Sequence, residues 1–279
     1  MKKLVADSGS TKADWRLIEN GKESRSFQTK GMNPFFRTSE DMFLELRETI
    51  FPGTGQDVEE VFFYGAGVAD QQKGEIVRTA LKQLFPDVKA ETQSDVLGAS
   101  RALFRNRQGI ACILGTGSNA CLYNGKEVTA KVPPLGFILG DECSGGVLGR
   151  QLIGDYFKEV MPEKLRYLFG EQFPVNLSTV LEHVYRMERP NRYLAGFAPF
   201  ISQHIDEPYC RQLIQKNLTD FFERNVLKIP DYQNYSIGFV GSVAFYFSKF
   251  ISNLVSKYGF KDYRILKEPI NELVEYHKN

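Results

Sequence analysis

The sequence predicts an α/β protein of two similar lobes, because one short pattern of strands and turns occurs in it twice. In each copy a strand, a Gly/Ser/Thr turn, a second strand and an Asn-Gly-Lys-Glu turn follow one another. The Asn-Gly pairs of the two copies, at residues 20–21 and 124–125, are 104 positions apart. The chain has 279 residues, 42% of them hydrophobic, which is enough for two cores. We therefore expect one lobe at residues 1–105 and a second at residues 106–279.

The first lobe is expected to begin with three strands joined by tight turns. Strand-like runs at residues 3–5 and 14–19 flank the turn of residues 7–11, and Asn20-Gly21 is the pair that type I′ hairpin turns prefer. The third strand follows at residues 23–28. Apolar periodicity and turn residues then predict, in chain order, a helix at 39–50 with Ser39 as its N-cap, a strand at 60–64, a helix at 71–84, a strand at 88–92 and a helix at 95–103.

The second lobe repeats this beginning and then departs from it. Strands at residues 109–114 and 119–123 flank the turn of residues 115–118. A long helical insertion follows at about residues 149–225. The elements expected from there on are helices at 149–169, 177–186, 193–204 and 208–225, a strand at 236–240, a helix over 245–255, a strand at 263–266 and a helix at 270–276.

Composition and charge exclude several classes of partner and site. The formal net charge is +1 and no run of five basic residues occurs, so we expect no nucleic acid and no membrane as partner. No apolar run approaches the ~20 residues of a membrane span, and we expect a cytoplasmic protein. The cysteines form no C-x-x-C pair and the three histidines are far apart in the sequence. This pattern favours reduced core thiols over a structural zinc site.

The first Gly/Ser/Thr turn has the composition of a phosphate-binding hairpin. Asp7 ends a strand-like run, and Gly9, Ser10 and Thr11 follow it. Such small residues let backbone N–H groups and hydroxyls approach phosphate oxygens closely. Asp7 would then hold Mg²⁺ through water, since magnesium prefers oxygen ligands and keeps its waters. Taken alone, an ordinary hairpin turn with an Asp cap explains these residues equally well.

The second Gly/Ser/Thr turn is a stronger candidate for a phosphate site when it is considered together with the first. As a lone hairpin, the turn formed by Gly115, Thr116, Gly117 and Ser118 is more often structural than functional. Paired with the first turn inside a repeat, it predicts two phosphate-cradling hairpins for a nucleoside triphosphate. The sequence contains no G-x-x-x-x-G-K-[ST] loop, so this is not a Walker-type site.

Two further carboxylates are candidates for a role with substrate. Asp95 stands at the expected start of a helix, where capping alone is the ordinary explanation. Asp141 lies among four glycines within residues 136–146, a density that indicates backbone pressed against a ligand or a neighbouring loop. A carboxylate in such a place can bind sugar hydroxyls.

Six motifs in order resemble a known family. They occupy residues 7–11, 31–33 (Gly-Met-Asn), 94–98 (Ser-Asp-Val-Leu-Gly), 115–118, 140–144 (Gly-Asp-Glu-Cys-Ser) and 241–243 (Gly-Ser-Val). Together they resemble the eukaryote-type N-acetylglucosamine kinases and the wider benzoyl-CoA reductase activator/N-acetylglucosamine kinase ATPase family. The resemblance spans nearly the whole chain. It implies a duplicated actin-like (ribonuclease H-like) ATPase fold, with two lobes around a nucleotide cleft.

The resemblance also implies an activity and a set of site residues. The expected reaction is ATP- and Mg²⁺-dependent phosphorylation of an amino sugar, most of all N-acetylglucosamine at O6, with Asp95 as catalytic base. The positions that match phosphate contacts are Gly9, Ser10, Thr11, Gly115, Thr116 and Gly117, and those that match the adenosine-binding turn are Gly241 and Ser242. The positions that match sugar contacts are Asn33, Asp95, Ser118 and Asp141.

The sequence departs from the family pattern at two places. Cys143 stands where the family usually has glycine, and Pro269 is not followed by the Gly-Ala that often accompanies it. The closely placed cysteines of the activator ATPases are absent. Alternatives to the kinase of N-acetylglucosamine stay open: an ATPase-fold activator or sensor, or a kinase of glucosamine or N-acetylmuramic acid. The family's common arrangement is a homodimer, for which the helical insertion is our candidate interface.

Overall fold

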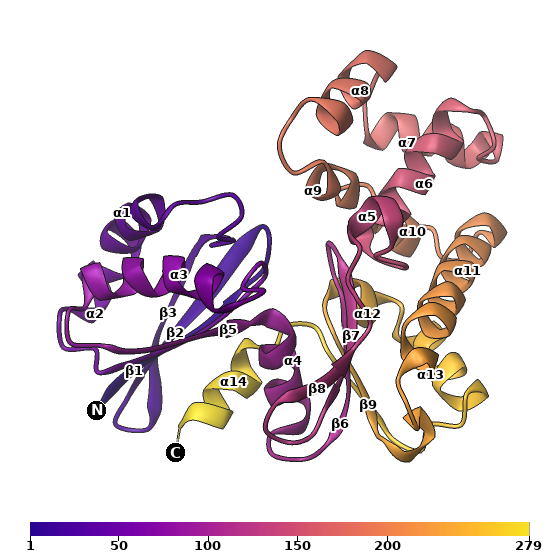
Figure 1. Cartoon of the computed structure of the whole chain (residues 1–279). Helices are drawn as coiled ribbons and strands as arrows, with labels where there is room; N and C mark the ends of the chain where they lie inside the picture. Colours follow the sequence, from indigo (N-terminus) through magenta and orange to yellow (C-terminus); the bar gives the residue numbers. More distant parts are fainter. Residues whose placement is uncertain (279) are drawn as a thin grey trace. The chain divides into compact units, whose positions relative to one another are not determined.

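The structure, a computed structural model, describes residues 1–278 and divides into two compact units (Figure 1). The first unit comprises Met1–Arg107, Tyr123–Val128 and residues 268–278, and the second comprises Gln108–Leu122 and Thr129–Lys267. Among the described residues, none of the helices combines the length and the apolar character that a membrane crossing requires.

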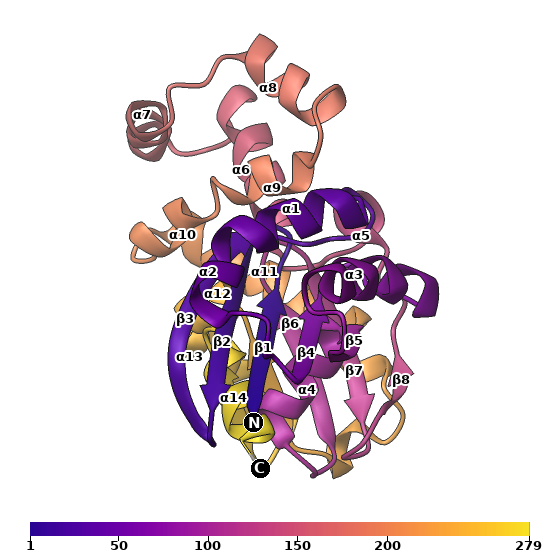
Figure 2. The same ribbon diagram turned by 90° about the vertical axis from the view of Figure 1, so that its left-hand side faces the viewer.

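Both units contain a five-stranded sheet with the same strand order. The first sheet has the order β3-β2-β1-β4-β5, which is visible in Figure 2, and the second has the order β10-β9-β6-β7-β8. In each sheet the first strand of the unit is central, the next two follow on one side and the last two on the other. The duplication read from the sequence is therefore confirmed at the level of topology. The strands are β1 Lys2–Ser8, β2 Lys12–Glu19, β3 Lys22–Lys30, β4 Glu60–Gly65, β5 Lys89–Ser94, β6 Gly109–Leu114, β7 Ser118–Tyr123, β8 Val128–Lys131, β9 Ile237–Val240 and β10 Tyr263–Leu266.

Helices cover the two faces of the first sheet differently. Alternate residues of β1 and β4, including Leu4 and Phe63, pack with α1 and α3 in one hydrophobic core. Helices α4 and α14 contact each other and the strands on the opposite face. The N-cap of α1 is Thr38, in a capping box with Asp41, so the expected cap at Ser39 is wrong by one residue. The helices of this unit are α1 Ser39–Thr49, α2 Phe51–Thr54, α3 Gln71–Leu84, α4 Asp95–Phe104 and α14 Ile270–His277.

The placement of α14 differs from the expected division of the chain. The predicted second lobe, residues 106–279, includes α14, whereas the structure groups α14 with the first unit. The buried residues of α14 include Ile270, Leu273 and Val274, and the helix contacts β1 and β2. A local sequence pattern shows which face of a helix is apolar, but it does not show which sheet that face will cover.

The second unit contains the helical insertion, which is more broken than expected. The helix predicted at 149–169 is two helices, with Pro162 at the N-cap of the second. The helix predicted at 193–204 is likewise interrupted before Pro199, because proline lacks the N–H that a helix interior needs. The elements of this unit are α5 Gly136–Leu139, α6 Gly145–Phe157, α7 Glu163–Gln172, α8 Leu177–Tyr185, α9 Pro190–Ala195, α10 Pro199–Gln203, α11 Pro208–Arg224, the 3₁₀ turns Val226–Lys228 and Tyr232–Asn234, α12 Ser242–Tyr246 and α13 Ser248–Lys257.

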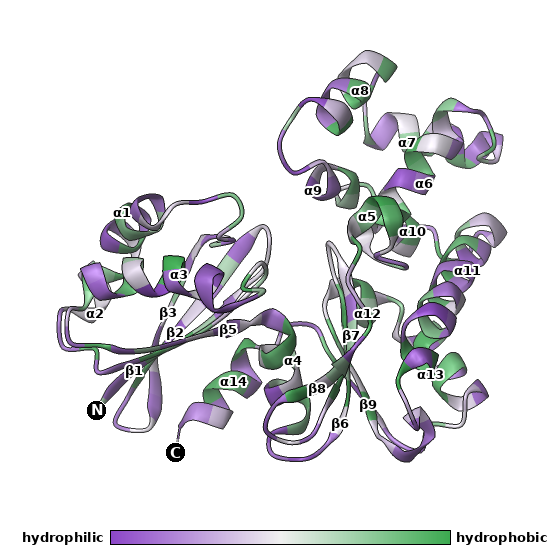
Figure 3. Cartoon of the chain, in the orientation of Figure 1, coloured by the Kyte–Doolittle hydropathy of each residue, from purple (hydrophilic) through white to green (hydrophobic). Residues whose placement is uncertain are grey.

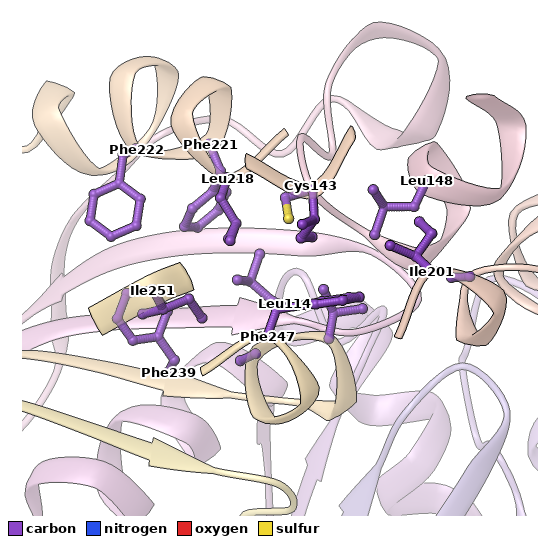
Figure 4. Close-up of a cluster of buried hydrophobic side chains, with 14 of the residues drawn as sticks. Leu114, Cys143, Leu148, Ile201, Leu218, Phe221, Phe222, Phe239, Phe247 and Ile251 are labelled. Carbon is purple, nitrogen blue, oxygen red and sulfur yellow. The ribbon is translucent and has the colours of Figure 1, made fainter. Parts of the chain in front are cut away.

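One core joins the second sheet to these helices. Figure 4 shows Leu114 and Phe239 of the strands with Phe221 and Phe222 of α11 and Ile251 of α13, and all five are essentially inaccessible to solvent. The short helix α5 is an exception, since it is apolar (Figure 3) and yet Ile138 and Leu139 are exposed. The core fixes the end of β6, from which the second Gly/Ser/Thr turn extends.

Candidate functional site

The first hairpin connects β1 and β2, and backbone hydrogen bonds within the turn and from Gly31 hold it in place. Its turn is closed by the Gly9 N–H, which donates to the Lys12 carbonyl at 3.0 Å, and the Gly31 N–H donates to the Thr11 carbonyl at 3.0 Å. A Cβ atom at Gly31 would clash with the backbone of Gly9 and lie 2.8 Å from the carbonyl carbon of Ser10. Gly31 is therefore a structural support of the hairpin, a role that the sequence motif at 31–33 did not by itself reveal.

Asn33 follows this support and is itself held in place. Its side chain is buried, and its Oδ1 accepts a hydrogen bond from the Phe35 N–H at 2.9 Å. Gly67, with a φ of +85°, lies so close to the Asn33 amide that a side chain at residue 67 would displace it. The loop after β4 and the loop after β3 thus meet at Asn33.

Asp95 is the first residue of α4, but it does not cap that helix. The N-cap is Ser94, whose hydroxyl accepts from the Leu97 N–H at 3.3 Å. Asp95 Oδ1 accepts from the Val96 N–H at 2.9 Å. Burial raises the pKa of Asp95 to about 6, although the hydrogen bonds from Val96 and from its own backbone oppose the rise. Ser94, and not Asp95, is therefore the N-cap of α4, and Asp95 is a buried carboxylate with a raised pKa.

Asp7 belongs to a cluster of acids that no motif of the sequence indicates. Burial, followed by the negative charges of Asp95, Asp14 and Glu268, raises the pKa of Asp7 to about 7, while Lys12 acts in the opposite direction. Lys12 Nζ lies 2.9 Å from Asp14 Oδ2 and 2.9 Å from Glu268 Oε1. The pairing of Asp7 with Asp14 follows from the β1–β2 register. No sequence pattern of this kind predicts that Glu268 lies near Asp7, because Glu268 comes from the far end of the chain.

The acids around Asp7 are the candidate place for the expected Mg²⁺ ion. Within residues 1–278, no three His, Cys, Asp or Glu side chains are arranged so that they could hold a metal by themselves. Asp7 nevertheless has the donor chemistry that Mg²⁺ prefers, and it lies among like charges that a cation would relieve. The residues fit a cation that takes its other ligands from water and phosphates.

The second hairpin is held by the first turn of α6. The Gly115 N–H donates to the Gly117 carbonyl at 3.0 Å, which closes the turn. The N–H groups of Gly145 and Gly146 donate to the carbonyls of Gly115 and Thr116 at 2.7 and 3.1 Å. A Cβ atom at Gly115 would meet nothing within 4 Å. The backbone of the hairpin is thus fixed on one side and open enough at Gly115 for a ligand to approach.

Asp141 lies beside this hairpin. A Cβ atom at Gly117 would come within 3.1 Å of Asp141 Oδ2, so a larger residue there would crowd the carboxylate. Burial raises the pKa of Asp141, a hydrogen bond from the Ser118 N–H lowers it, and the charge of Glu142 raises it. The structure therefore brings Ser118 and Asp141, which are 23 positions apart, into direct contact.

Cys143 has a backbone conformation that favours glycine, the residue that the resemblance leads one to expect at this position. Its φ is +60°, in the left-handed region where glycine is favoured, and its side chain is fully buried. Burial raises the pKa of the thiol far above its usual range. The cysteine is a core residue at a position whose backbone suits glycine.

Gly241 packs against the start of the second hairpin. Its φ is +124°, and a Cβ atom there would clash with the Leu114 carbonyl and lie 3.2 Å from the Gly115 nitrogen. Ser242 is the exposed first residue of α12. Within the second unit the predicted site residues therefore form one group around the hairpin.

The predicted residues of the first unit also gather near its own hairpin. Asp7 and Asp95 are close enough for their charges to interact, and Thr11 hydrogen-bonds to the residue two positions before Asn33. Ser10 is partly exposed and Gly9 and Thr11 are exposed, as a ligand contact requires.

Comparisons with known proteins place the chain. No model of a protein family matches it, and no curated protein matches it significantly. Among solved structures, the putative N-acetylglucosamine kinase from Porphyromonas gingivalis is 43% identical with a TM-score of 0.93, over 99% of this chain and 98% of that one. The putative N-acetylglucosamine kinase from Chromobacterium violaceum is 13% identical with a TM-score of 0.79, again over 99% and 98%.

A more distant likeness concerns the fold alone. A ROK family glucokinase from Streptomyces griseus, solved with glucose and AMPPNP, is 16% identical with a TM-score of 0.58, over 99% of this chain and 98% of that one. With the repeated strand order, this likeness confirms the predicted fold class, an α/β fold made of two similar units. The resemblance inferred from the six motifs is also confirmed, and the chain belongs to the family of the putative N-acetylglucosamine kinase from Porphyromonas gingivalis.

Proposed function

We propose that this protein is an ATP-dependent carbohydrate kinase that phosphorylates an amino sugar, with O6 of N-acetylglucosamine as the first acceptor to test. The observation that carries the proposal is the full-length similarity to the Porphyromonas gingivalis protein, at 43% identity. The site geometry supports it, because the second hairpin has open space at Gly115 and the carboxylates of Asp95 and Asp141 are each held by a backbone N–H.

Asp95 is the proposed catalytic base. Its pKa of about 6 leaves the carboxylate ionised at neutral pH, yet more basic than an ordinary aspartate. A base of this strength can accept the proton of a sugar hydroxyl as the hydroxyl oxygen attacks phosphorus. Ser94 is the N-cap of α4, and Asp95 accepts hydrogen bonds from the Val96 N–H and its own backbone N–H. A carboxylate has about four acceptor positions, so it can still accept from a sugar hydroxyl.

The two hairpins are proposed to hold the phosphates of ATP. The first unit offers Gly9, Ser10 and Thr11, and the second offers the backbone from Gly115 to Gly117, where the open space in the direction of a Gly115 Cβ leaves room for a phosphate. Asp7 would hold Mg²⁺ through water, and the ion would neutralise charge on the phosphates. Gly241 and Ser242 are proposed to contact the adenosine.

The sugar is proposed to contact Asn33, Ser118 and Asp141 in addition to Asp95. Asn33 is fixed by the Phe35 N–H and by Gly67, and a fixed amide can bind a hydroxyl with little loss of entropy. Asp141 is fixed by the Ser118 N–H and can accept hydrogen bonds from two hydroxyl groups.

The experiment is a coupled assay of ADP release across a panel of sugars. The panel contains N-acetylglucosamine, glucosamine, N-acetylmuramic acid, N-acetylmannosamine and glucose. We expect N-acetylglucosamine to give the highest kcat/KM, and Asp95→Asn to lower kcat by about 10²–10⁴-fold while ATP still binds. ATP hydrolysis that no sugar alters would contradict the kinase and favour a nucleotide-dependent activator or sensor.

The expected homodimer and cytoplasmic location stay predictions from the sequence. Sedimentation velocity at micromolar concentration tests the dimer directly, independently of the catalytic proposal.

A further inference from the structure

The C-terminal helix α14 ends in a buried histidine that takes part in a hydrogen-bond chain. His277 is 7% exposed, and its ring stacks on Phe62 with 3.8 Å between the ring centroids and 16° between the planes. Its Nε2 lies 2.8 Å from the hydroxyl of Tyr64, whose side chain is fully buried on β4. Figure 1 shows α14 beside α4, and the two helices are in contact.

The direction of this chain follows from the chemistry of its members. Arg101 Nη1, on α4, lies 2.5 Å from Tyr64 Oη and 2.7 Å from Glu91 Oε1. Arginine has no acceptor, so it donates to Tyr64, and the single phenol proton is left to bond His277 Nε2. Burial, with the positive charges of Arg101 and Lys3, lowers the pKa of His277 to about 3, so the ring is neutral and Nε2 can accept.

The same tyrosine also fixes the distance of α4 from the sheet. A Cβ atom at Gly98 would lie 2.8 Å from both Cβ and Cγ of Tyr64, so the helix backbone rests directly on the tyrosine. Gly98 and Arg101 are three residues apart, and Asp95 is three residues before Gly98, so Gly98 is the neighbour of both on the surface of α4. Tyr64 pairs with Asp7 in the β1–β4 register, which places it on the same side of the sheet as the acid cluster.

From these contacts we propose that His277, Tyr64 and Arg101 form a positioning network that sets the height and rotation of α4 and thereby aims the Asp95 carboxylate. None of the three touches the substrate in this proposal; they act through the helix. The inference rests on the proposed role of Asp95 as base. A small rotation of α4 would move a carboxylate at its first residue, and a misplacement of about 1 Å can lower a rate about 10²-fold.

The first pair of variants tests the hydrogen-bond acceptor at residue 277. His277→Leu removes the acceptor, whereas His277→Gln keeps an acceptor oxygen at a similar distance from the backbone. Tyr64→Phe is the second probe, because it keeps the ring against Gly98 and removes the hydroxyl that joins Arg101 to His277. We expect kcat to fall about 10–100-fold in His277→Leu and Tyr64→Phe, with KM for ATP and sugar within about 2-fold of wild type. His277→Gln should recover most of the lost kcat.

A second readout does not depend on activity. Amide hydrogen exchange at residues 96–98 should be faster in His277→Leu and Tyr64→Phe than in wild type and His277→Gln, while amides of β6, in the second unit, serve as the internal reference. The proposal is overturned if kcat and the exchange of α4 are both unchanged in these variants, or if Gln is as damaging as Leu. Absence of sugar-dependent ADP release in the wild type would instead reject the proposed function, and the exchange data would still decide whether the network fixes α4.

Discussion

Asp7 carries an electrostatic strain that a bound cation would relieve. Burial and three neighbouring carboxylates disfavour its charged form, and Lys12 is shared with Asp14 and Glu268. Without ligand, ionising Asp7 above neutral pH therefore costs folding free energy. A Mg²⁺ ion bound with ATP would favour the charged form of Asp7 instead of the protonated form. The same carboxylate that would suit the ion therefore lowers the stability of the protein without ligand.

The prediction at this scale is that Asp7→Asn stabilises the protein without ligand. A carboxyl whose pKa is higher in the folded than in the unfolded state contributes stability while protonated, and this contribution is lost as the pH rises from about 4 to about 7. The gain should thus be near zero at pH 4 and reach about 3–4 kcal/mol at pH 8. Urea denaturation at pH 4, 6 and 8 measures it, with Asp87→Asn, at an exposed carboxylate, as control. A gain that does not change with pH would contradict the explanation.

At the scale of elements, glycines hold both hairpins where larger residues would move them. Gly31 packs on the first hairpin, and Gly241 packs on Leu114 at the start of the second. The first turn of α6 contributes two more N–H donors to the second hairpin. The position of each hairpin is therefore determined in part by loops that follow other strands of the same sheet.

The prediction for these elements is that Gly241→Ala damages both stability and ATP binding. Alanine at a φ of +124° is strained, and its Cβ would push the Leu114 carbonyl away. We expect a loss of about 1–3 kcal/mol in unfolding free energy and a several-fold increase in the KM for ATP. Gly154→Ala is the matched control, since that glycine lies in α6 with nothing within 4 Å, and there alanine should be neutral or stabilise by about 0.5–1 kcal/mol. Equal behaviour of the two variants would refute the assigned role.

Elements with a complete local signal were predictable, and those set by tertiary contacts were not. Asn20 and Gly21 both have positive φ, as the predicted type I′ turn requires. In the second copy only Gly125 does, because the Asn124 side chain instead accepts from two backbone N–H groups. Helix α3 and strand β6 have the predicted bounds. The position of α14 and the approach of Glu268 to Asp7 depend on which surfaces meet late in the chain, and no periodic pattern encodes that choice.

The candidate site likewise contains residues that the sequence could predict and residues that it could not. Its proposed members have a signal along the sequence, because five of the six motifs lie at the end of a strand, whereas the motif at 140–144 follows the short helix α5. Its supports were missed: Tyr64 and His277 are 213 positions apart, and neither stands in a motif. Side chains that act through packing have no sequence signature of their own.

At the scale of the whole molecule, the first unit is assembled from three separated segments of the chain. Its last segment supplies α14, which contacts β1, β2 and α4. Ile270, Leu273 and Val274 are all buried there. Each such side chain contributes about 1.5–3 kcal/mol, so the three together approach the 5–15 kcal/mol that stabilises a typical domain. The contacts of α14 with β1, β2 and α4 all lie within the first unit, so the core of the second unit does not depend on them.

A chain that ends at Lys267 should therefore lose the stability of the first unit while the second persists. Without α14, the face of the first sheet that carries Asp7 and Tyr64 is exposed, and the buried partner of Tyr64 is lost. We expect amide exchange of β1 and β4 to become fast, while β6 and β9 keep protection close to that of the full chain. The full-length His277→Leu variant is the matched control, because it removes one hydrogen bond but keeps the apolar face of α14, and β1 should stay protected in it. Protection of β1 in the truncated chain equal to that in the full chain would show that α14 is dispensable for the fold of the first unit.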